Sequence, residues 1–106
     1  MLDQYRRLKA EHPGTILFFR MGDFYETFGE DALLASRELG IALTSRDKKK
    51  EGALPLAGVP HHAVDGYLRT LVQRGHSVAI AEQMEPADQA RGLVDRQVVE
   101  VLTPGT

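Results

Sequence analysis

The sequence predicts an α/β domain in which a mixed β-sheet of about four to six strands is flanked by helices. Short apolar runs alternate along the chain with segments whose apolar residues recur at helical spacing. Several of the runs are continuous rather than alternating, which is typical of strands covered on both faces. The length of 106 residues suits one domain with a single hydrophobic core.

The first half of the chain predicts two helices separated by a strand. Residues 2–12 repeat apolar side chains about once per helical turn, which predicts a short amphipathic helix ended by the Pro-Gly pair at 13–14. Residues 15–21 are β-branched and aromatic and predict a buried strand. Residues 31–39 predict a helix closed by Gly40. A candidate strand, a charged loop and a second apolar stretch then follow at residues 41–45, 46–52 and 54–59.

The second half predicts one strongly amphipathic helix and two strands. A broad apolar face runs from about residue 62 to residue 74, and a glycine follows it at a position suited to ending a helix. The apolar runs 77–81 and 97–102 predict two strands covered on both faces. The last residues, Thr-Pro-Gly-Thr, break regular structure. We therefore place the domain at residues 1–102 and expect residues 103–106 to begin a linker to a further domain.

Composition excludes several classes of function. Lys and Arg total 13 against 15 Asp and Glu, a formal net charge of −2. Because phosphate binding needs a cationic footprint, we expect the chain alone to bind nucleic acid weakly. The absence of cysteine excludes disulfides, thiolate metal sites and cysteine nucleophiles. No apolar run approaches the roughly 20 residues of a membrane span, and the first residues lack a secretory signal, so we expect a cytoplasmic domain without a membrane partner.

One segment is unusual for its aromatic content. Phe24, Tyr25 and Phe28 follow Gly22-Asp23, so three of the seven aromatic residues fall within five positions. We expect a strand-to-helix turn here, with a helix beginning near Asp23 that places Phe24 and Phe28 on one face and Tyr25 about 100° away. At least one ring is then a candidate for exposure. Gly22 has no side chain and allows the backbone to approach another surface closely.

A purely structural role explains the same segment. Asp23 and Glu26 fit the D-x-x-E pattern of a helix capping box, in which each side chain satisfies a free amide at the start of the helix. Phe24 and Phe28 can then simply belong to the core. The pattern alone favours this structural alternative, and it stays open at this point.

Four strings carry a family resemblance: FFRMGDFYETFGEDA, LPLAGVPHHAVDGYL, VAIAEQ and VVEVLTPGT. Their order and spacing resemble the N-terminal mismatch-recognition domain of the MutS family of DNA mismatch repair proteins, over essentially the whole chain. The joint occurrence of GDFYE, AGVP and a terminal TPGT makes the resemblance specific. The chain is similar to the bacterial branch of the family, which carries a Phe-x-Glu element, here Phe24-Tyr25-Glu26.

The resemblance implies a role for each residue of this element. In the family, the phenylalanine enters the minor groove and stacks on a mispaired or unpaired base, the duplex kinks there, and the glutamate hydrogen-bonds the same base. Carried over, these mismatch-binding roles fall on Phe24 and Glu26, while Tyr25 packs inward or supports the turn. The candidates for supporting or backbone contacts are Gly22, Asp23, Tyr25, Lys48, Lys49 and Lys50. The alternative for the three lysines is a solvated loop without a DNA contact.

The resemblance also implies a larger parent protein. The family is an ATPase, so ATP and Mg²⁺ are expected in the parent and not in this chain, which has no G-x-x-x-x-G-K-[ST] phosphate loop. The implied partners are mismatched double-stranded DNA, the remaining domains of the same chain, a second copy in a homodimer, and downstream mismatch repair proteins. A bacterial, cytoplasmic and nucleoid-associated location is expected.

Two other classes of function compete with DNA sensing. A metal-dependent nuclease would require acidic residues to converge in space. Its candidates are Asp23, Glu30, Asp31 and the Asp47-Lys48-Lys49 run. A protein-interaction module would use the exposed aromatic residues. The adjacent His61 and His62 have no third ligand at a suitable spacing, so we expect them to begin a helix and expect no metal site.

Overall fold

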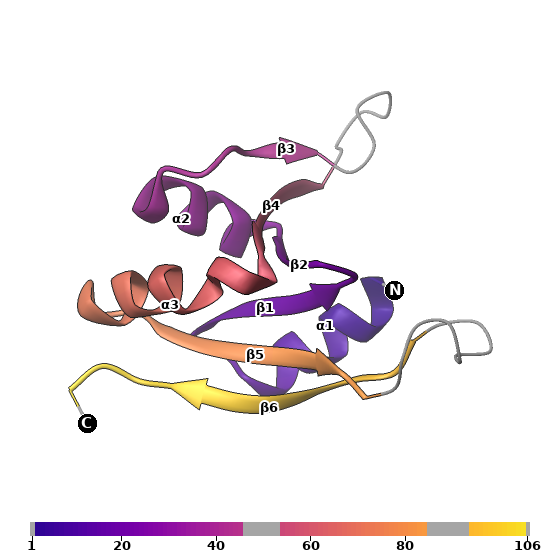
Figure 1. The fold of residues 1–106 in the computed structure, drawn as a ribbon. Coiled ribbons are helices and arrows are strands. Elements are labelled where there is room, and N and C mark those ends of the chain that lie inside the picture. Colours follow the sequence, from indigo (N-terminus) through magenta and orange to yellow (C-terminus); the bar gives the residue numbers. More distant parts are fainter. Residues whose placement is uncertain (1, 46–53, 85–93, 106) are drawn as a thin grey trace.

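Six strands form one mixed sheet in the computed structural model, which describes residues 2–45, 54–84 and 94–105. The sheet has the order β3-β4-β2-β1-β5-β6 (Figure 1). Its strands are β1 (Thr15–Met21), β2 (Phe24–Phe28), β3 (Thr44–Ser45), β4 (Pro55–Pro60), β5 (Ser77–Gln83) and β6 (Arg96–Leu102). The pair β1–β5 is parallel and the other neighbours are antiparallel. The predicted α/β class with a mixed sheet is confirmed.

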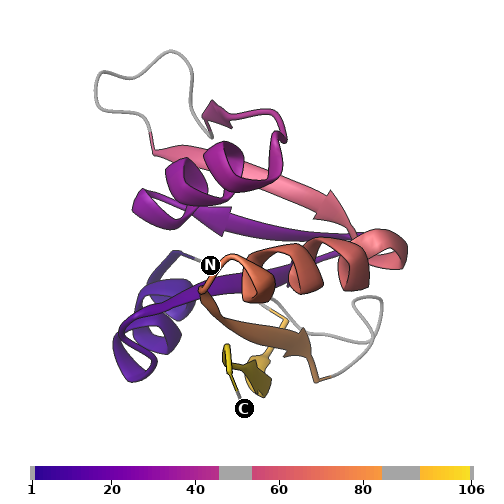
Figure 2. The same cartoon turned by 90° about the vertical axis from the view of Figure 1, so that its left-hand side faces the viewer.

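Three α-helices cover the sheet within the described ranges. They are α1 (Leu2–Glu11), α2 (Glu30–Leu39) and α3 (Val64–Gln73), and the short 3-10 helix η1 (His61–Ala63) leads into α3. The helix α1 lies across the sheet from α3 (Figure 2). The helices predicted at residues 2–12, 31–39 and about 62–74 are confirmed to within two residues, and Gly40 ends α2 with a φ of 69°. None of the described helices is long and apolar enough to cross a membrane.

Each face of the sheet carries its own hydrophobic cluster. The cluster under α2 and α3 includes Ile16, Phe18, Tyr25, Ala35, Val59, Leu68 and Leu71. The cluster under α1 is made of Tyr5, Leu8, Leu17, Phe19, Phe28, Ala79 and Ala81. Because successive residues of a strand point to opposite faces, β1 supplies both clusters. This explains why its sequence is continuously apolar, as predicted.

Two predictions about strands are wrong at the edges of the sheet. Of the run 41–45, only Thr44–Ser45 pairs with β4, since Ile41 packs instead against the cluster under α2 and α3. The strand β6 is not covered on both faces, because Val99 and Val101 are 57% and 45% exposed. It is an edge strand with a register shift opposite Ile80/Ala81, and such bulges are common at sheet edges.

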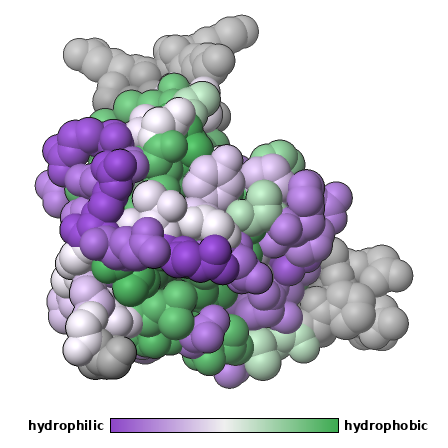
Figure 3. All heavy atoms as spheres, turned by 60° about the vertical axis from the view of Figure 1, so that its left-hand side comes forward, coloured by the Kyte–Doolittle hydropathy of each residue, from purple (hydrophilic) through white to green (hydrophobic). Residues whose placement is uncertain are grey.

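Apolar side chains also reach the surface beside β6. Figure 3 shows them gathered below a band of polar residues on the side where α3 and the C-terminal end of β6 come forward. The shallow groove between these two elements is lined by residues that include Leu68, Val72 and Leu102.

The predicted charged loop 46–52 lies outside the described residues. The domain boundary at residue 102 coincides with the end of β6 and stays a prediction.

A polar network is buried between α1, β1 and the first turn of α2. The Asp31 carboxylate accepts hydrogen bonds from the Tyr5 hydroxyl at 3.3 Å and from the Leu17 amide at 3.1 Å. The Lys9 ammonium lies 3.0 Å from the same carboxylate. Tyr5 also lies 3.3 Å from the Thr27 hydroxyl. Burial, as the largest cause, raises the pKa of Tyr5 from 10.0 to about 12.

This raised pKa predicts a loss of stability in alkaline solution. The folded protein keeps the Tyr5 proton at pH values where the unfolded chain loses it, so the stabilisation is complete below about pH 10 and is lost as the pH rises to about 12. We expect the free energy of unfolding to fall by about 2–3 kcal/mol across this window. Thermal unfolding of Tyr5→Phe should show a flatter alkaline limb, whereas the control Tyr67→Phe should follow the wild type. A Tyr5→Phe profile parallel to the wild type would contradict this assignment.

Candidate functional site

The aromatic segment begins a strand, so the predicted strand-to-helix turn is wrong. Gly22 and Asp23 instead form a two-residue hairpin turn between β1 and β2, with Met21 paired to Phe24. Gly22 has a φ of 61°, whereas the φ of Asp23, like that of every described residue other than glycine, is not positive. A positive φ at the first of the two turn residues alone is typical of a type II′ turn. Pairing with β1 on one side and β4 on the other holds residues 24–28 extended. The helix capping box is therefore not formed.

Strand geometry sorts the side chains of this segment by face. Phe24, Glu26 and Phe28 alternate with Tyr25, so the first three share the face of the sheet that α1 packs against. Phe28 is 3% exposed in the cluster under α1, whereas Phe24 is 47% exposed at the hairpin end. Tyr25 is 7% exposed in the opposite cluster. The predictions of an exposed ring and of an inward Tyr25 are confirmed.

Side chains from β1 and β5 hold the hairpin turn on one side. The Gly22 amide donates to Gln83 Oε1 at 3.0 Å, and Arg20 Nε donates to the Gly22 carbonyl at 2.5 Å. The Glu82 carboxylate accepts hydrogen bonds from Arg20 at 3.0 Å and from the Tyr25 hydroxyl. Burial, followed by Glu82, raises the pKa of Tyr25 above its usual value, so this hydroxyl stays a donor at neutral pH.

The start of η1 holds the turn on the other side. The His61 amide donates to the Asp23 carbonyl at 2.8 Å, and its ring Nδ1 lies 3.0 Å from the same oxygen. His61 and His62 begin a helix, as expected. The role of His61 at the turn was not foreseen, nor were those of the residues that hold the other side: Arg20, Glu82 and Gln83. Apart from the bond between Arg20 and its near neighbour Gly22, these hydrogen bonds join positions far apart in the chain, so no local pattern indicates them.

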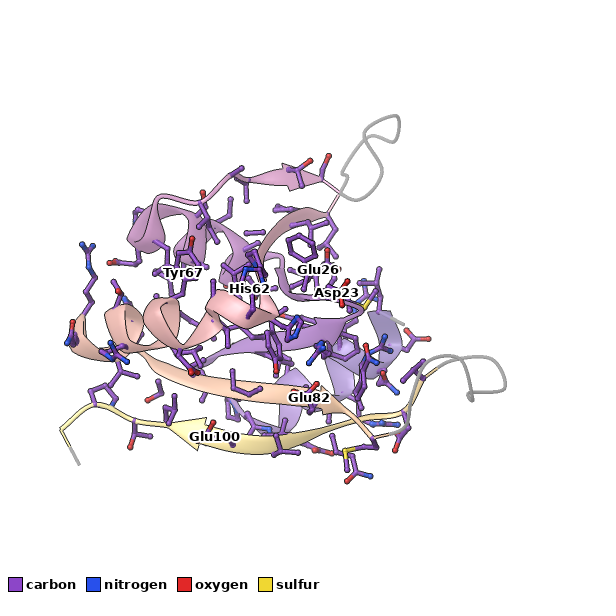
Figure 4. All side chains as sticks on the ribbon, in the orientation of Figure 1. Asp23, Glu26, His62, Tyr67, Glu82 and Glu100 are labelled. Atoms are coloured by element: carbon purple, nitrogen blue, oxygen red, sulfur yellow. The ribbon has the colours of Figure 1, made fainter. Side chains whose placement is uncertain are left out.

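Glu26 lies beside a buried cation. It is partly buried and pairs with Phe19 of β1, and the Arg96 guanidinium lies 4.5 Å from the centre of the Phe19 ring. Arg96 is 5% exposed and donates to the Arg20 carbonyl at 2.7 Å and to Gln4 Oε1 at 3.0 Å. Burial lowers the pKa of Arg96, and the charge of Glu26 opposes that shift. The two charges are therefore close enough to interact. Figure 4 shows the labelled Glu26 at the hairpin end of the sheet.

The structure places the candidate acidic residues Asp23 and Asp31 in different surroundings. Asp23 is exposed at the hairpin turn, while Asp31 is buried in the network with Lys9 and Tyr5. Within residues 2–45, 54–84 and 94–105, no group of three or more His, Cys, Asp or Glu side chains could hold a metal ion. The predicted contacts at Lys48, Lys49 and Lys50, and the run beginning at Asp47, lie outside the described residues.

Fold and site together define a small α/β domain in which a hairpin, held by hydrogen bonds on both sides, exposes the Phe24 ring beside the Glu26 carboxylate. Comparison with known proteins identifies the family: residues 1–106 match MutS domain I, and the chain belongs to this family. The predicted resemblance is confirmed.

The curated relatives bear the name DNA mismatch repair protein MutS. The protein of Brevibacillus brevis is 54% identical over 106 residues, and that of Staphylococcus aureus strain JH9 is 55% identical over the same length. The protein of Methanothrix thermoacetophila is 54% identical over 107 residues. Each comparison covers 100% of this chain and 12% of the relative, so the chain spans about an eighth of these proteins.

Proposed function

We propose that this chain is the mismatch-sensing domain of a DNA mismatch repair protein, in which Phe24 stacks on a mispaired or unpaired base and Glu26 hydrogen-bonds that base. The observation that carries the proposal is the Phe24 ring, 47% exposed at the end of a hairpin that is held on both sides. Membership of the MutS domain I family supports it. The Tyr25 hydroxyl donates a hydrogen bond to Glu82 and so helps to hold the hairpin that carries the Phe24 ring.

An aromatic wedge suits the detection of many different mispairs. A mispair differs from a correct pair mainly in stability and deformability, and every base has a π face on which a ring can stack. Stacking contributes about 1–3 kcal/mol per base. Opening a base step costs a few kcal/mol, and bending the duplex costs roughly 1–6 kcal/mol more, with lower values where pairing is weak. For paired DNA the two costs together exceed the stacking gain, so the duplex resists the ring, whereas the lower costs at a mispair allow the ring to enter.

The carboxylate of Glu26 adds selectivity. The DNA phosphates repel an ionised carboxylate, so Glu26 disfavours non-specific binding to intact duplex. It can be protonated and donate to a base acceptor, or stay ionised and accept an imino N–H from a displaced base. The charge of Arg96 lies close enough to interact with the Glu26 carboxylate, while the phosphates of bound DNA act on it in the opposite direction, so the proposal includes both forms of the contact.

A charge-neutral variant tests this role. We expect Glu26→Gln, in the full-length protein, to keep or increase affinity for matched duplex and to reduce the ratio of mismatched to matched affinity by roughly 5- to 10-fold, about 1 kcal/mol. Anisotropy titrations with two duplexes that differ by one mispair measure both values. The control is Glu100→Gln, which makes the same change at an exposed position on β6 far from the hairpin (Figure 4). An unchanged ratio in Glu26→Gln would refute the role of the carboxylate.

The same titration tests the proposed function itself. The wild-type full-length protein should bind the mismatched duplex at least about tenfold more tightly than the matched one. Equal affinity for the two duplexes would rule out mismatch sensing by this domain.

The remaining parts of the proposal concern the longer protein. With a net charge of −2, this chain itself is expected to bind DNA phosphates weakly. We therefore infer that other domains, joined through residues 103–106, and a second copy of the protein bind the phosphate backbone. The described residues do not fit ATP or Mg²⁺, because they hold no cluster of metal ligands and the sequence has no phosphate loop. These cofactors, contacts with downstream mismatch repair proteins and a cytoplasmic, nucleoid-associated location belong to the parent.

A further inference from the structure

Gly58 is a glycine inside a strand without a backbone reason for being one. It lies in the middle of β4 and pairs with Glu26 of β2. It is not among the residues with a positive φ, so its conformation is open to any residue. A glycine in a strand interior loses more conformational freedom on folding and packs no side chain, which weakens the strand. Another cause must therefore account for it.

Close packing does not account for it either. A Cβ built at position 58 would lie 3.4 Å from Glu26 Cγ, 3.4 Å from the Tyr25 carbonyl oxygen and 3.8 Å from Phe24 Cδ1. These are ordinary van der Waals distances, so an alanine would fit. Two of these three neighbours are the side chains that form the candidate site. The space that the glycine leaves empty is therefore bounded by Phe24 and Glu26.

Larger residues flank Gly58 on its own face of β4. Along β4, Leu56 and Pro60 lie two residues to either side and share its face, and they pair with Phe28 and Phe24 of β2. At the Phe28 end, the face is buried under α1. At the Phe24 end it is exposed. A glycine at such a place allows a ligand to approach the backbone closely.

We propose that Gly58 is a specificity-determining residue, whose missing side chain leaves room for a displaced nucleobase between the Phe24 ring and the Glu26 carboxylate. The inference rests on the proposed function and adds where the base lies. A flat heterocycle placed over Gly58 stacks on the ring and presents its edge to the carboxylate. A side chain at position 58 fills that place and separates the base from Glu26.

A size series at position 58 tests the proposal in the full-length protein. Gly58→Ala should weaken binding to the mismatched duplex a few-fold, and Gly58→Val should weaken it by about tenfold or more, because the lost contact is a stacked and hydrogen-bonded base. Affinity for matched duplex should change less than about twofold in both variants. Thermal unfolding should show no loss of stability in Gly58→Ala, since alanine suits the backbone there. The matched control is Gly66→Ala in α3, where nothing lies within 4 Å of an added Cβ and no change in either affinity is expected.

Each outcome separates this inference from the proposed function. If the wild type prefers mismatched duplex and Gly58→Val keeps the full preference with a native melting temperature, the inference is overturned and the proposed function stands. If the wild type shows no preference, both fail. Should Gly58→Val melt early, Gly58→Ala decides, and wild-type mismatch affinity in that variant overturns the inference.

Discussion

We expect the replacement of Phe24 with alanine to remove the proposed preference for mismatched DNA and to leave the domain folded. The ring is the most exposed of the segment's aromatic side chains, at 47%, and it stands at the end of the hairpin, so its loss takes little from either hydrophobic cluster. Its stacking contribution of about 1–3 kcal/mol corresponds to roughly 5- to 150-fold in affinity. We expect mismatch affinity to fall by that factor toward the value for matched duplex, while the free energy of unfolding changes by no more than about 1 kcal/mol.

The same strand offers a matched control for this variant. Phe28 is four residues further along β2, points to the same face and is 3% exposed among Tyr5 and other residues under α1. Phe28→Ala should destabilise the domain by about 3–5 kcal/mol, the usual cost of removing a buried phenylalanine. Duplex titrations and thermal unfolding of both variants make the comparison. If Phe24→Ala unfolds as Phe28→Ala does, the ring at position 24 belongs to the core and the wedge is refuted.

Replacing Asp31 with alanine should destabilise the fold by about 2–4 kcal/mol. The carboxylate is 8% exposed and is the common acceptor for the Tyr5 hydroxyl, the Leu17 amide and the Lys9 ammonium. Removing it leaves three donors without that acceptor, and a broken buried pair typically costs 3–5 kcal/mol. The expected value is lower here because the Lys9 side chain is 31% exposed and can turn toward water.

The neighbouring residue provides the control for Asp31. Glu30 lies in the same first turn of α2 but is exposed, so Glu30→Ala removes only a favourable interaction with the helix dipole, worth about 0.3–1 kcal/mol. Chemical denaturation of the two variants measures the difference. Equal destabilisation would mean that the buried network contributes nothing beyond the helix terminus. The Asp31 network lies near the start of β1 and the hairpin at its other end, so the folded fraction of Asp31→Ala should keep its mismatch preference.

The failed prediction of a helix at residues 24–28 has a clear physical cause. Residues i and i+4 share a face in a helix and in a strand, so the spacing of Phe24 and Phe28 suits both. The D-x-x-E pattern favours a helix start, and nothing local opposes it. Pairing with β1 and with β4 decides for the strand, and β4 lies some thirty positions further along the chain. Two-sided pairing satisfies the backbone of the segment better than one turn of helix would.

The α/β class, the three helices, the buried strand β1 and the family could all be predicted from local signals in the sequence: periodicity, glycines at helix ends and motif strings. The sequence also marked the aromatic segment from which one ring emerges. The packing of the folded chain sets the 47% exposure of the Phe24 ring, the hydrogen bonds of Gln83 and His61 to the turn, and the positions of Arg96 and Gly58 near Glu26. These depend on contacts between strands far apart in the chain, and the energy of such contacts leaves no pattern in any single stretch of sequence.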